Sequence, residues 1–408
     1  MHPVARRPLL LAAALGALCP DLAAAQGGGD GRAEWRLGAL FPFSGPLSLL
    51  GDESFRGLEL AIEERNAAGG LLGRPIRLLK GDAADPTQAV AEVRRLTGAE
   101  RASAVFGTFG SALAAAASQV ADAGGVPYLE LGAVADELST RGYRWFFRSC
   151  PRAAEIGRLA ADAVPEVLAP GWGVPPASLR VVLLHEDAPF GASVAEAQNA
   201  RLRERGLPAV EKVAYAPRSS DLSPLVQRLR SLGAEVVLHT GYPNEVVLLF
   251  RAFREAGWRP RVVVGAGAGY SLADTAHAVG PEFEGTLNAA FTQFEVNEAA
   301  APGARPFVDT YKRRYGAEPR SGHSLANYAG AGIFLDAMTR AGGTDKDRLR
   351  AAILATDIAP ADTATGWGAR FDERGQNTRG RPFLCQWQNG RQVTVFPAAA
   401  AVAPLRLR

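Results

Sequence analysis

Residues 179–205 read "LRVVLLHEDAPFGASVAEAQNARLRER" and show the pattern that sets the fold class. An uninterrupted apolar run from Val181 to His185 ends in a turn with proline and glycine, and helical spacing follows from Ser193 to Arg205. A strand without polar alternation has both faces covered, as in a parallel sheet. Residues 234–240, "AEVVLHT", repeat the apolar run. The stretch therefore predicts an α/β fold with parallel sheets and right-handed helical crossovers.

The same alternation of short apolar runs and helical segments recurs along the chain. Strands are predicted at Trp35 to Phe41, Ile76 to Leu79, Ala104 to Phe106, Tyr128 to Leu131, Val181 to His185, Val236 to Thr240 and Arg261 to Val264. Helices are predicted at Phe55 to Asn66, Gln88 to Leu96, Ala112 to Ala123, Glu155 to Leu168, Ser193 to Arg205, Leu222 to Leu232, Glu245 to Ala256, Phe307 to Tyr315 and Ala326 to Arg340. Two strand-like pieces, "FLCQWQNG" and "RQVTVF", close the chain. A proline-rich insertion at 164–179 separates two sets of units and indicates two similar lobes.

The bulk composition fits this architecture. A chain of 408 residues exceeds what one hydrophobic core usually supports, and its hydrophobic fraction of 47% can fill two cores. The formal charge is only +3, so no strong field points to nucleic acid or to an anionic membrane.

The N-terminus has the features of an export signal. Arg6 and Arg7 precede a ten-residue apolar core, and Ala25 ends a run of small residues suited to cleavage. We expect residues 1–25 to be a signal peptide, residues 26–32 a flexible leader, and the mature protein to reach the periplasm. The arginine pair leaves the general and twin-arginine export routes open. Lipidation at Cys19 is the weaker alternative, because Leu18 is not the small residue that a lipoprotein signal requires.

Cleavage would leave Cys150 and Cys385 as the cysteines of the mature chain. In an oxidising compartment they either form a disulfide or stay as two separately buried thiols, and the sequence leaves both possibilities open.

Ligands of open parallel sheets bind at the carboxyl ends of the strands, where loops lead into helix N-termini. The loops at these positions are rich in glycine, small hydroxyl residues and a few aromatics, which suits a compact neutral or anionic ligand. They comprise residues 42–52, 107–112, 130–136, 185–193, 239–245 and 264–271.

Catalytic and cofactor motifs are incomplete. Residues 259–276, "RPRVVVGAGAGYSLADTA", place Tyr270 where a dinucleotide-binding motif needs its third glycine. Ser324 lies in "GHSLA" without the strand-to-helix turn of a hydrolase nucleophile, and a helix N-cap is the expected role. The histidines lack metal-ligand spacing, so His185 and His239 are expected to be strand-end polar residues facing a cleft. Asp187 is expected on a solvated loop, with a ligand contact as the alternative.

Several ordered segments resemble a known family. They are "RLGALFPFSGPLSLLGDESFRGLELAIEERNAAGGLLGRPIRL", "AVFGTFGSALAAAASQVADAGGVPYLELGA", "HEDAPFGAS", "GWRPRVVVGAGAG" and "FVDTYKRRYG". Together they resemble the periplasmic substrate-binding proteins of branched-chain amino acid type ABC importers over essentially the whole mature chain. The resemblance implies the type I periplasmic binding protein fold, two Rossmann-like lobes joined by three crossover strands with the ligand cleft between them.

The resemblance also implies domain boundaries. The first lobe would comprise residues 33–149 and 292–370, and the second lobe residues 150–291 and 371–408. Cys150 and Cys385 would then both lie where the chain enters the second lobe, which favours a disulfide between them.

Family members that bind amino acids hold the ligand carboxylate with a hydroxyl and backbone amides of the first lobe. Ser111 matches that hydroxyl at the start of a helix whose dipole favours an anion. A plain N-cap is the alternative, and the two roles are compatible. The ligand-binding residues that the resemblance implies are Ser44, Leu50, Phe109, Ser111, Gly132, Ala133, Val134, Phe190, Tyr242, Gly267 and His323.

This chain departs from the family at four of these positions. Val134 replaces a serine or threonine, Leu50 an aromatic residue and Phe190 a tyrosine. Gly267 stands near the position of the carboxylate that pairs with the ligand ammonium.

The loss of that carboxylate bears on the ligand. A buried ammonium without an anionic partner costs on the order of several kcal/mol. Unless Glu130 or Asp187 substitutes, the pattern disfavours an ordinary α-amino acid and favours a small carboxylate, or another polar-headed molecule, with an apolar or aromatic body.

The predicted function is that of a periplasmic solute-binding protein. It would bind a small carboxylate or amino-acid-like solute and deliver it to the ABC permease subunits at the inner membrane. No catalytic residue, metal or cofactor is predicted, nor any nucleic-acid partner. The alternatives are a sensing module of the same fold that serves a receptor, and an exported serine hydrolase that uses Ser324.

Overall fold

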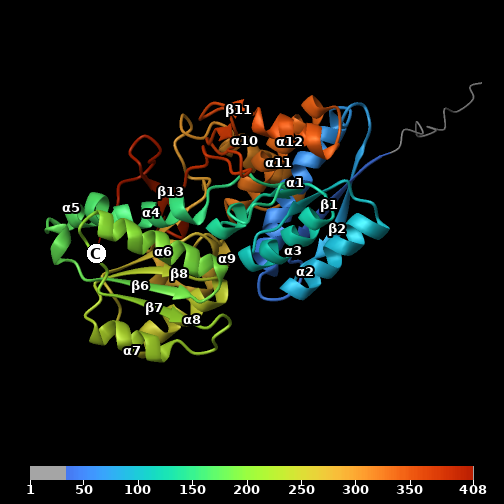
Figure 1. The fold of residues 1–408 in the computed structure, drawn as a ribbon. Coiled ribbons are helices and arrows are strands. Elements are labelled where there is room, and N and C mark those ends of the chain that lie inside the picture. The colour runs from blue at the N-terminus through green and yellow to red at the C-terminus, as the bar shows by residue number, and fades with distance from the viewer. Residues whose placement is uncertain (1–33, 408) are drawn as a thin grey trace, which may run out of the picture. The chain divides into compact units, whose positions relative to one another are not determined.

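A computed structural model describes residues 34–407, and their strands form two main sheets (Figure 1). The predicted signal peptide (1–25) and leader (26–32) lie outside the described residues. The first sheet has the order β2-β1-β3-β4-β5 and is parallel throughout. Its strands are β1 (Trp35–Phe41), β2 (Ile76–Asp82), β3 (Ala104–Gly107), β4 (Tyr128–Glu130) and β5 (Phe146–Arg148).

The second sheet has the order β14-β13-β10-β9-β8-β6-β7. Its strands are β6 (Val181–Glu186), β7 (Glu211–Tyr215), β8 (Val236–Thr240), β9 (Val262–Ala266), β10 (Leu287–Ala290), β13 (Phe383–Gln388) and β14 (Arg391–Phe396). Strands β6 to β10 are parallel, whereas β13 and β14 form an antiparallel hairpin at the edge. A small third sheet pairs β11 (Asp357–Ile358) with β12 (Ala369–Arg370).

Helices accompany both sheets and define two lobes. The first lobe contains α1 (Ser48–Ala67), α2 (Pro86–Arg94), α3 (Ser111–Ala123), α10 (Ala304–Tyr315), α11 (His323–Ala341) and α12 (Lys346–Leu354). The second contains α4 (Ala153–Ala163), α5 (Ala169–Trp172), α6 (Pro189–Glu204), α7 (Ser223–Ser231), α8 (Pro243–Glu255) and α9 (Ala273–Val279). The chain passes between the two sheets over residues 149–152, 291–303 and 371–382. None of the helices in residues 34–407 is both long and apolar enough to span a bilayer.

Local sequence explains where the helices begin and end. Helix α2 starts because the Asp85 side chain accepts a hydrogen bond from the Gln88 amide, and Pro86 presets the first helical turn. Helix α11 ends at Gly342, whose φ of 71° lies in the left-handed region that glycine adopts without strain.

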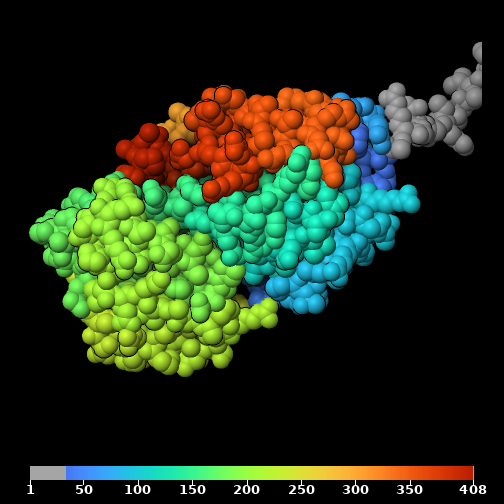
Figure 2. Space-filling model, viewed as in Figure 1, coloured from blue at the N-terminus to red at the C-terminus, as the bar shows by residue number. Residues whose placement is uncertain are grey.

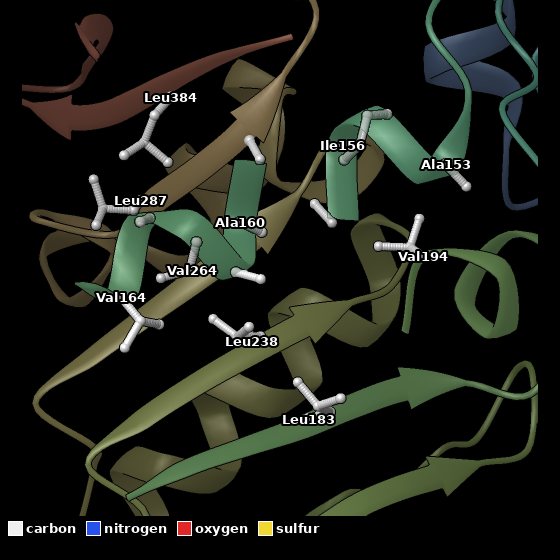
Figure 3. Close-up of a cluster of buried hydrophobic side chains, with 14 of the residues drawn as sticks. Ala153, Ile156, Ala160, Val164, Leu183, Val194, Leu238, Val264, Leu287 and Leu384 are labelled. Carbon is white, nitrogen blue, oxygen red and sulfur yellow. The ribbon is translucent and has the colours of Figure 1, made fainter. Parts of the chain in front are cut away.

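The core of the second lobe forms where α4 lies over its sheet. Figure 3 shows Ile156 and Ala160 of this helix facing the strands, with Leu238, Val264 and Leu287 pointing back toward them. All five side chains are almost completely buried. Their burial contributes to the hydrophobic stabilisation of this lobe.

The predicted elements are all present, most of them within a few residues, although α1 begins at Ser48 rather than Phe55, and the fold class is confirmed. Strands β5, β7, β10, β11 and β12 and helices α5, α9 and α12 were not predicted. Strand β7 is an edge strand with two exposed positions, and β10 is short and rich in alanine, so neither has a continuous apolar run of large residues.

The expected disulfide is not formed. Cys150 and Cys385 are both free and buried. Cys150 belongs to the cluster that contains Leu384, whereas Cys385 packs with Phe383 and Ala400 in another cluster. Successive side chains of a strand point to opposite faces of a sheet, so Cys385 points away from the face that Leu384 shares with Cys150. The prediction of a disulfide is therefore wrong for this structure, and the alternative of two buried thiols is correct.

Candidate ligand-binding site

A cavity lies between the two lobes and contains about 320 Å³ of space between atoms. Its lining residues are Phe109, Ser111, Gly132, Val134 and His323 of the first lobe, Ile156, Phe190, Tyr242, Gly267 and Ala268 of the second, and Phe291 at the start of a crossing. Because both lobes supply its walls, a solute gains full access when the lobes part.

Eight of the eleven residues implied by the resemblance line this cavity, and three do not. Ser44 lies on an exposed turn, where its hydroxyl donates to Asp82 at 2.6 Å. Leu50 is fully buried in a small apolar cluster with Phe109. Ala133 is fully buried, and its amide and carbonyl are hydrogen-bonded to Glu130 and Arg148. A direct contact between these three residues and a solute in the cavity is therefore not expected.

Ser111 is the first residue of α3 rather than its N-cap, which is Gly110. The side chain is 1% exposed, and its Oγ accepts a hydrogen bond from the Ala135 amide at 3.2 Å. The hydroxyl proton therefore remains available to a solute. The amides of the first helical turn add positive potential at the same place, and the Ser111 amide among them donates to the Tyr242 hydroxyl. This end of the cavity suits an anion.

Glu130 and Arg148 hold the neighbouring loop, residues 130–136, from beneath. The buried Glu130 carboxylate accepts from the amides of Gly132 at 2.8 Å and Ala133 at 2.7 Å. The guanidinium of Arg148 donates to the carbonyls of Ala133 and Ala135 at 3.1 and 2.8 Å. Burial raises the pKa of Glu130, while these amides act against the rise. Glu130 is thus occupied by backbone groups and does not replace the missing partner for an ammonium.

Aromatic rings form most of the apolar wall. The Phe190 and Tyr242 ring centroids lie 5.2 Å apart, and those of Phe291 and His323 lie 5.0 Å apart. Burial raises the pKa of Tyr242 above its ordinary range, so its hydroxyl stays protonated. Such a wall favours a flat or branched apolar body in the solute.

His323 adds a neutral polar group to this wall. Its Nδ1 lies 2.8 Å from the Ser321 hydroxyl, and burial lowers the pKa of His323 to about 4. Glu53 holds the supporting turn, because its carboxylate accepts from the amide of Ser321 and from the hydroxyl of Ser324 at 2.6 Å. The imidazole is therefore uncharged near neutral pH and is fixed in orientation.

Ser324 is not the N-cap of its helix. Helix α11 begins at His323 with Gly322 as N-cap, and Ser324 is fully buried with its hydroxyl bonded to Glu53. This position gives the hydroxyl no contact with the cavity.

Gly267 directly follows strand β9 and belongs to the glycine-rich stretch 259–276. Its φ is 65°, a conformation that side chains rarely adopt, and its amide donates to Asn288 at 2.8 Å. A carboxylate side chain is disfavoured at this position by the backbone itself. Gly265 admits the Tyr270 ring, which would overlap a Cβ there, so packing requires this glycine.

The strand-end histidines and Asp187 lie away from the cavity. His239 is completely buried inside the second lobe, with Nε2 2.8 Å from the Tyr215 hydroxyl, and burial lowers its pKa to about 3. His185 is also buried, with Nδ1 2.9 Å from the carbonyl of Glu186. The expectation that both face a cleft is wrong, because both imidazoles are buried and neither residue lines the cavity. Asp187 is exposed. Among residues 34–407, no group of three metal-ligating side chains occurs.

The comparisons with known proteins agree with this architecture. The sequence profile described as periplasmic binding protein matches residues 34–392. The Leu/Ile/Val-binding protein homolog 7 of Brucella suis biovar 1 (strain 1330) is 45% identical over 382 residues, which are 93% of this chain and 96% of that protein. The chain belongs to the periplasmic binding protein family. Members of this family bind solutes, so the chain is a solute-binding protein.

Solved periplasmic binding proteins share the fold. The leucine-binding protein LivK of Thermotoga maritima MSB8 superposes with a TM-score of 0.78 at 22% identity, over 88% of this chain and 97% of that one. A solute-binding protein of an ABC transporter from R. palustris, solved in complex with benzoate, gives 0.74 at 20% identity, over 91% and 98%. At these identities the likeness establishes the fold alone.

Three lining residues of this periplasmic binding protein were not among the predicted ones: Ile156, Ala268 and Phe291. Ile156 was missed because its spacing is that of an ordinary core residue of a helix. Phe291 was missed because it follows strand β10, which was not predicted. Ala268 lies inside the loop 264–271 that the strand-end rule selects, so that rule could have found it.

Proposed function

We propose that this protein captures a small carboxylate with an apolar or aromatic body between its lobes and delivers it to the permease subunits of an ABC importer. The observation that carries the proposal is the cavity itself. Ser111 and the first turn of α3 offer donors to an anion, and aromatic rings surround the remaining space.

The chemistry of the cavity also limits the class of solute. Gly267 offers no carboxylate to an ammonium, and Glu130 is occupied by backbone amides. An α-amino acid would bury its ammonium without an anionic partner at a cost on the order of several kcal/mol. An acid that lacks this group avoids the penalty.

The proposed location is the periplasm, after cleavage near Ala25. The lobe boundaries given above, 33–149 with 292–370 and 150–291 with 371–408, belong to the same proposal. Closure of the lobes around the solute would be the form that the permease recognises.

A thermal-shift screen with aliphatic and aromatic acids, followed by calorimetric titration, tests the proposal. A bound solute at a hundredfold excess over its dissociation constant stabilises the protein by about 2.7 kcal/mol, which raises the melting temperature measurably. Tight binding of leucine or valine, with no preference for the corresponding acids that lack the amine, would contradict it.

A further inference from the structure

A wide groove adjoins the cavity and shares Phe190 and Tyr242 with it. The groove contains about 1710 Å³ of space between atoms, part of it open to solvent. Leu47 and Gly110 contribute from the first lobe and Glu245 from the second. Figure 2 shows the surface indented where the blue-to-cyan part of the first lobe meets the yellow-green part of the second. The two aromatic rings thus stand between the cavity and the groove.

Two buried carboxyl groups lie in the wall of this groove. Glu186 is 1% exposed and Glu245 is 6% exposed. Oε1 of Glu186 accepts from the Gly191 amide at 2.9 Å, and Oε1 of Glu245 accepts from the Arg218 amide at 3.3 Å. Oε2 of each side chain has no hydrogen-bond partner within residues 34–407. A buried carboxyl oxygen without a partner is costly unless a ligand satisfies it.

The groove around Glu186 and Glu245 contains more acidic than basic side chains. Asp85 and Arg218 are the other charged residues of the groove, so three carboxyl groups face one guanidinium. Arg218 is exposed, and its side chain forms no ion pair with the described residues. Burial, helped by the nearby carboxyl groups of Glu245 and Asp187, raises the pKa of Glu186 to about 7, while the Gly191 amide acts against the rise. A cation would relieve this repulsion.

The pair fits an organic cation better than a metal ion. No third ligating side chain joins it among the described residues, whereas metal sites need several ligands. The shared rings of Phe190 and Tyr242 instead provide aromatic surface, to which ammonium and guanidinium groups are attracted. Glu186, Tyr242 and Glu245 all line the groove. Burial is the main reason that the pKa of Tyr242 is raised, and both glutamates add to it.

We infer that Glu186 and Glu245 form a second subsite, which receives a cationic group at the end of the solute remote from its carboxylate. The inference rests on the proposed function, in which Ser111 receives the carboxylate. Since the rings separate the two subsites, the solute class is an acid with a distal ammonium or guanidinium group rather than an α-amino acid.

The test compares matched probes by calorimetric titration of the full mature chain. The probes are 4-(aminomethyl)benzoate and 4-guanidinobenzoate, with 4-(hydroxymethyl)benzoate and 4-methylbenzoate as neutral analogues. We expect the cationic acids to bind roughly tenfold or more tightly than the neutral ones. Glu186→Gln and Glu245→Gln should each remove most of this preference and leave the affinity for the neutral acids within about twofold. Glutamine retains the acceptor for the backbone amide, and an unchanged far-ultraviolet circular dichroism spectrum verifies folding.

Glu255→Gln is the matched control, because Glu255 lies on the same helix as Glu245 but is exposed and does not line the groove. This variant should retain the preference for the cationic acids. Equal binding of cationic and neutral acids to the wild type, or an equal loss of preference in Glu255→Gln, would overturn the subsite. If none of the acids binds, the proposed function itself fails, and this outcome is distinct from a failure of the subsite alone.

Discussion

The rings of Phe109 and Tyr242 meet edge to face across the cleft, with their centroids 6.0 Å apart. Phe109 follows strand β3 in the first lobe, and Tyr242 precedes helix α8 in the second. Both rings also line the cavity, so the contact that joins the lobes is part of the site. Lobe closure and the shape of the cavity therefore depend on the same pair of side chains.

Replacing Tyr242 with alanine is expected to open the unliganded protein. The substitution removes an aromatic contact between the lobes that is worth about 0.5–1.5 kcal/mol beyond its buried area. Small-angle scattering should show a larger radius of gyration for this variant than for the wild type. Tyr143→Ala is the control, because Tyr143 packs within the first lobe alone. Superimposable curves for Tyr242→Ala and the wild type would contradict the prediction.

Removing the Ser111 hydroxyl should weaken the binding of a carboxylate. A hydrogen bond to a charged group contributes about 1.5–3 kcal/mol, so Ser111→Ala is expected to raise the dissociation constant by roughly ten- to a hundredfold. Ser118→Ala is a close control, because Ser118 is on the same helix, is fully buried, and its Oγ has no partner among the described residues. An equal effect of both changes on calorimetric affinity would refute a specific role for Ser111.

The buried imidazole of His323 should make stability depend on pH in the acid range. The folded protein keeps His323 neutral down to a pKa of about 4, whereas an unfolded histidine has a pKa near 6.5. Between these values the unfolded state binds more protons, so stability is complete above about pH 6.5 and is lost as the pH falls toward 4.

Chemical denaturation near pH 6.5 and near pH 4 should therefore show a smaller loss of unfolding free energy for His323→Asn than for the wild type. The buried His239 acts in the same direction and Glu186, whose pKa of about 7 is raised, in the opposite one. Both contributions persist in the variant and cancel in the comparison. His277→Asn, at an exposed position, should lose as much stability as the wild type. An identical pH dependence of His323→Asn and the wild type would exclude this role.

The contact between helices α1 and α11 depends on Gly57. A Cβ at this position would overlap the carbonyl of Ser324, which belongs to the turn that positions His323. Gly57→Ala is expected to lower the free energy of unfolding by about 2–3 kcal/mol through overpacking. Gly332→Ala, with open space around its position on α11, should raise it by about 0.5–1 kcal/mol because alanine favours the helix. Urea denaturation of both variants distinguishes these opposite signs.

The two thiols are expected to stay reduced and protected. Burial raises the pKa of Cys385 to about 12 and that of Cys150 still higher, so neither forms the thiolate that reacts. A chain that begins at Gln26 should react with two equivalents of a thiol reagent only after unfolding. An unchanged melting temperature on adding a reductant is the accompanying expectation, and a large decrease would indicate a disulfide.

Much of the fold and part of the candidate site could be predicted from the sequence because strand, loop and helix follow one another in a fixed order. Ser111, Gly132, Phe190 and Tyr242 each lie just beyond a strand with a strong apolar pattern, and the strand-end rule gathers such loops at one edge. His239 also lies near the carboxyl end of a strand, β8, but it is buried inside the lobe, so the rule fails for this residue.

The remaining features depend on contacts that a single sequence does not encode locally. Ile156 has the apolar spacing of a core residue, and only the position of α4 beside the cleft gives it a second role. The partnerless oxygens of Glu186 and Glu245 belong to the end of strand β6 and the first turn of helix α8, which are almost sixty residues apart in the chain. The disulfide was expected because Cys150 and Cys385 both lie where the chain enters the second lobe. The alternation of side chains along strand β13 instead directs Cys385 to the opposite face of the sheet.

The loop that Glu130 and Arg148 support has a mechanical consequence. The carbonyl of Val134 accepts from the amide of Ala153 at 2.7 Å, so a residue that lines the cavity also fastens the first residue of α4. One peptide unit therefore serves both as a wall for the solute and as an anchor for the hinge strand 149–152. Redesigning selectivity at position 134 would consequently also alter how far the two halves can swing apart, and hence the rates at which a solute is taken up and released.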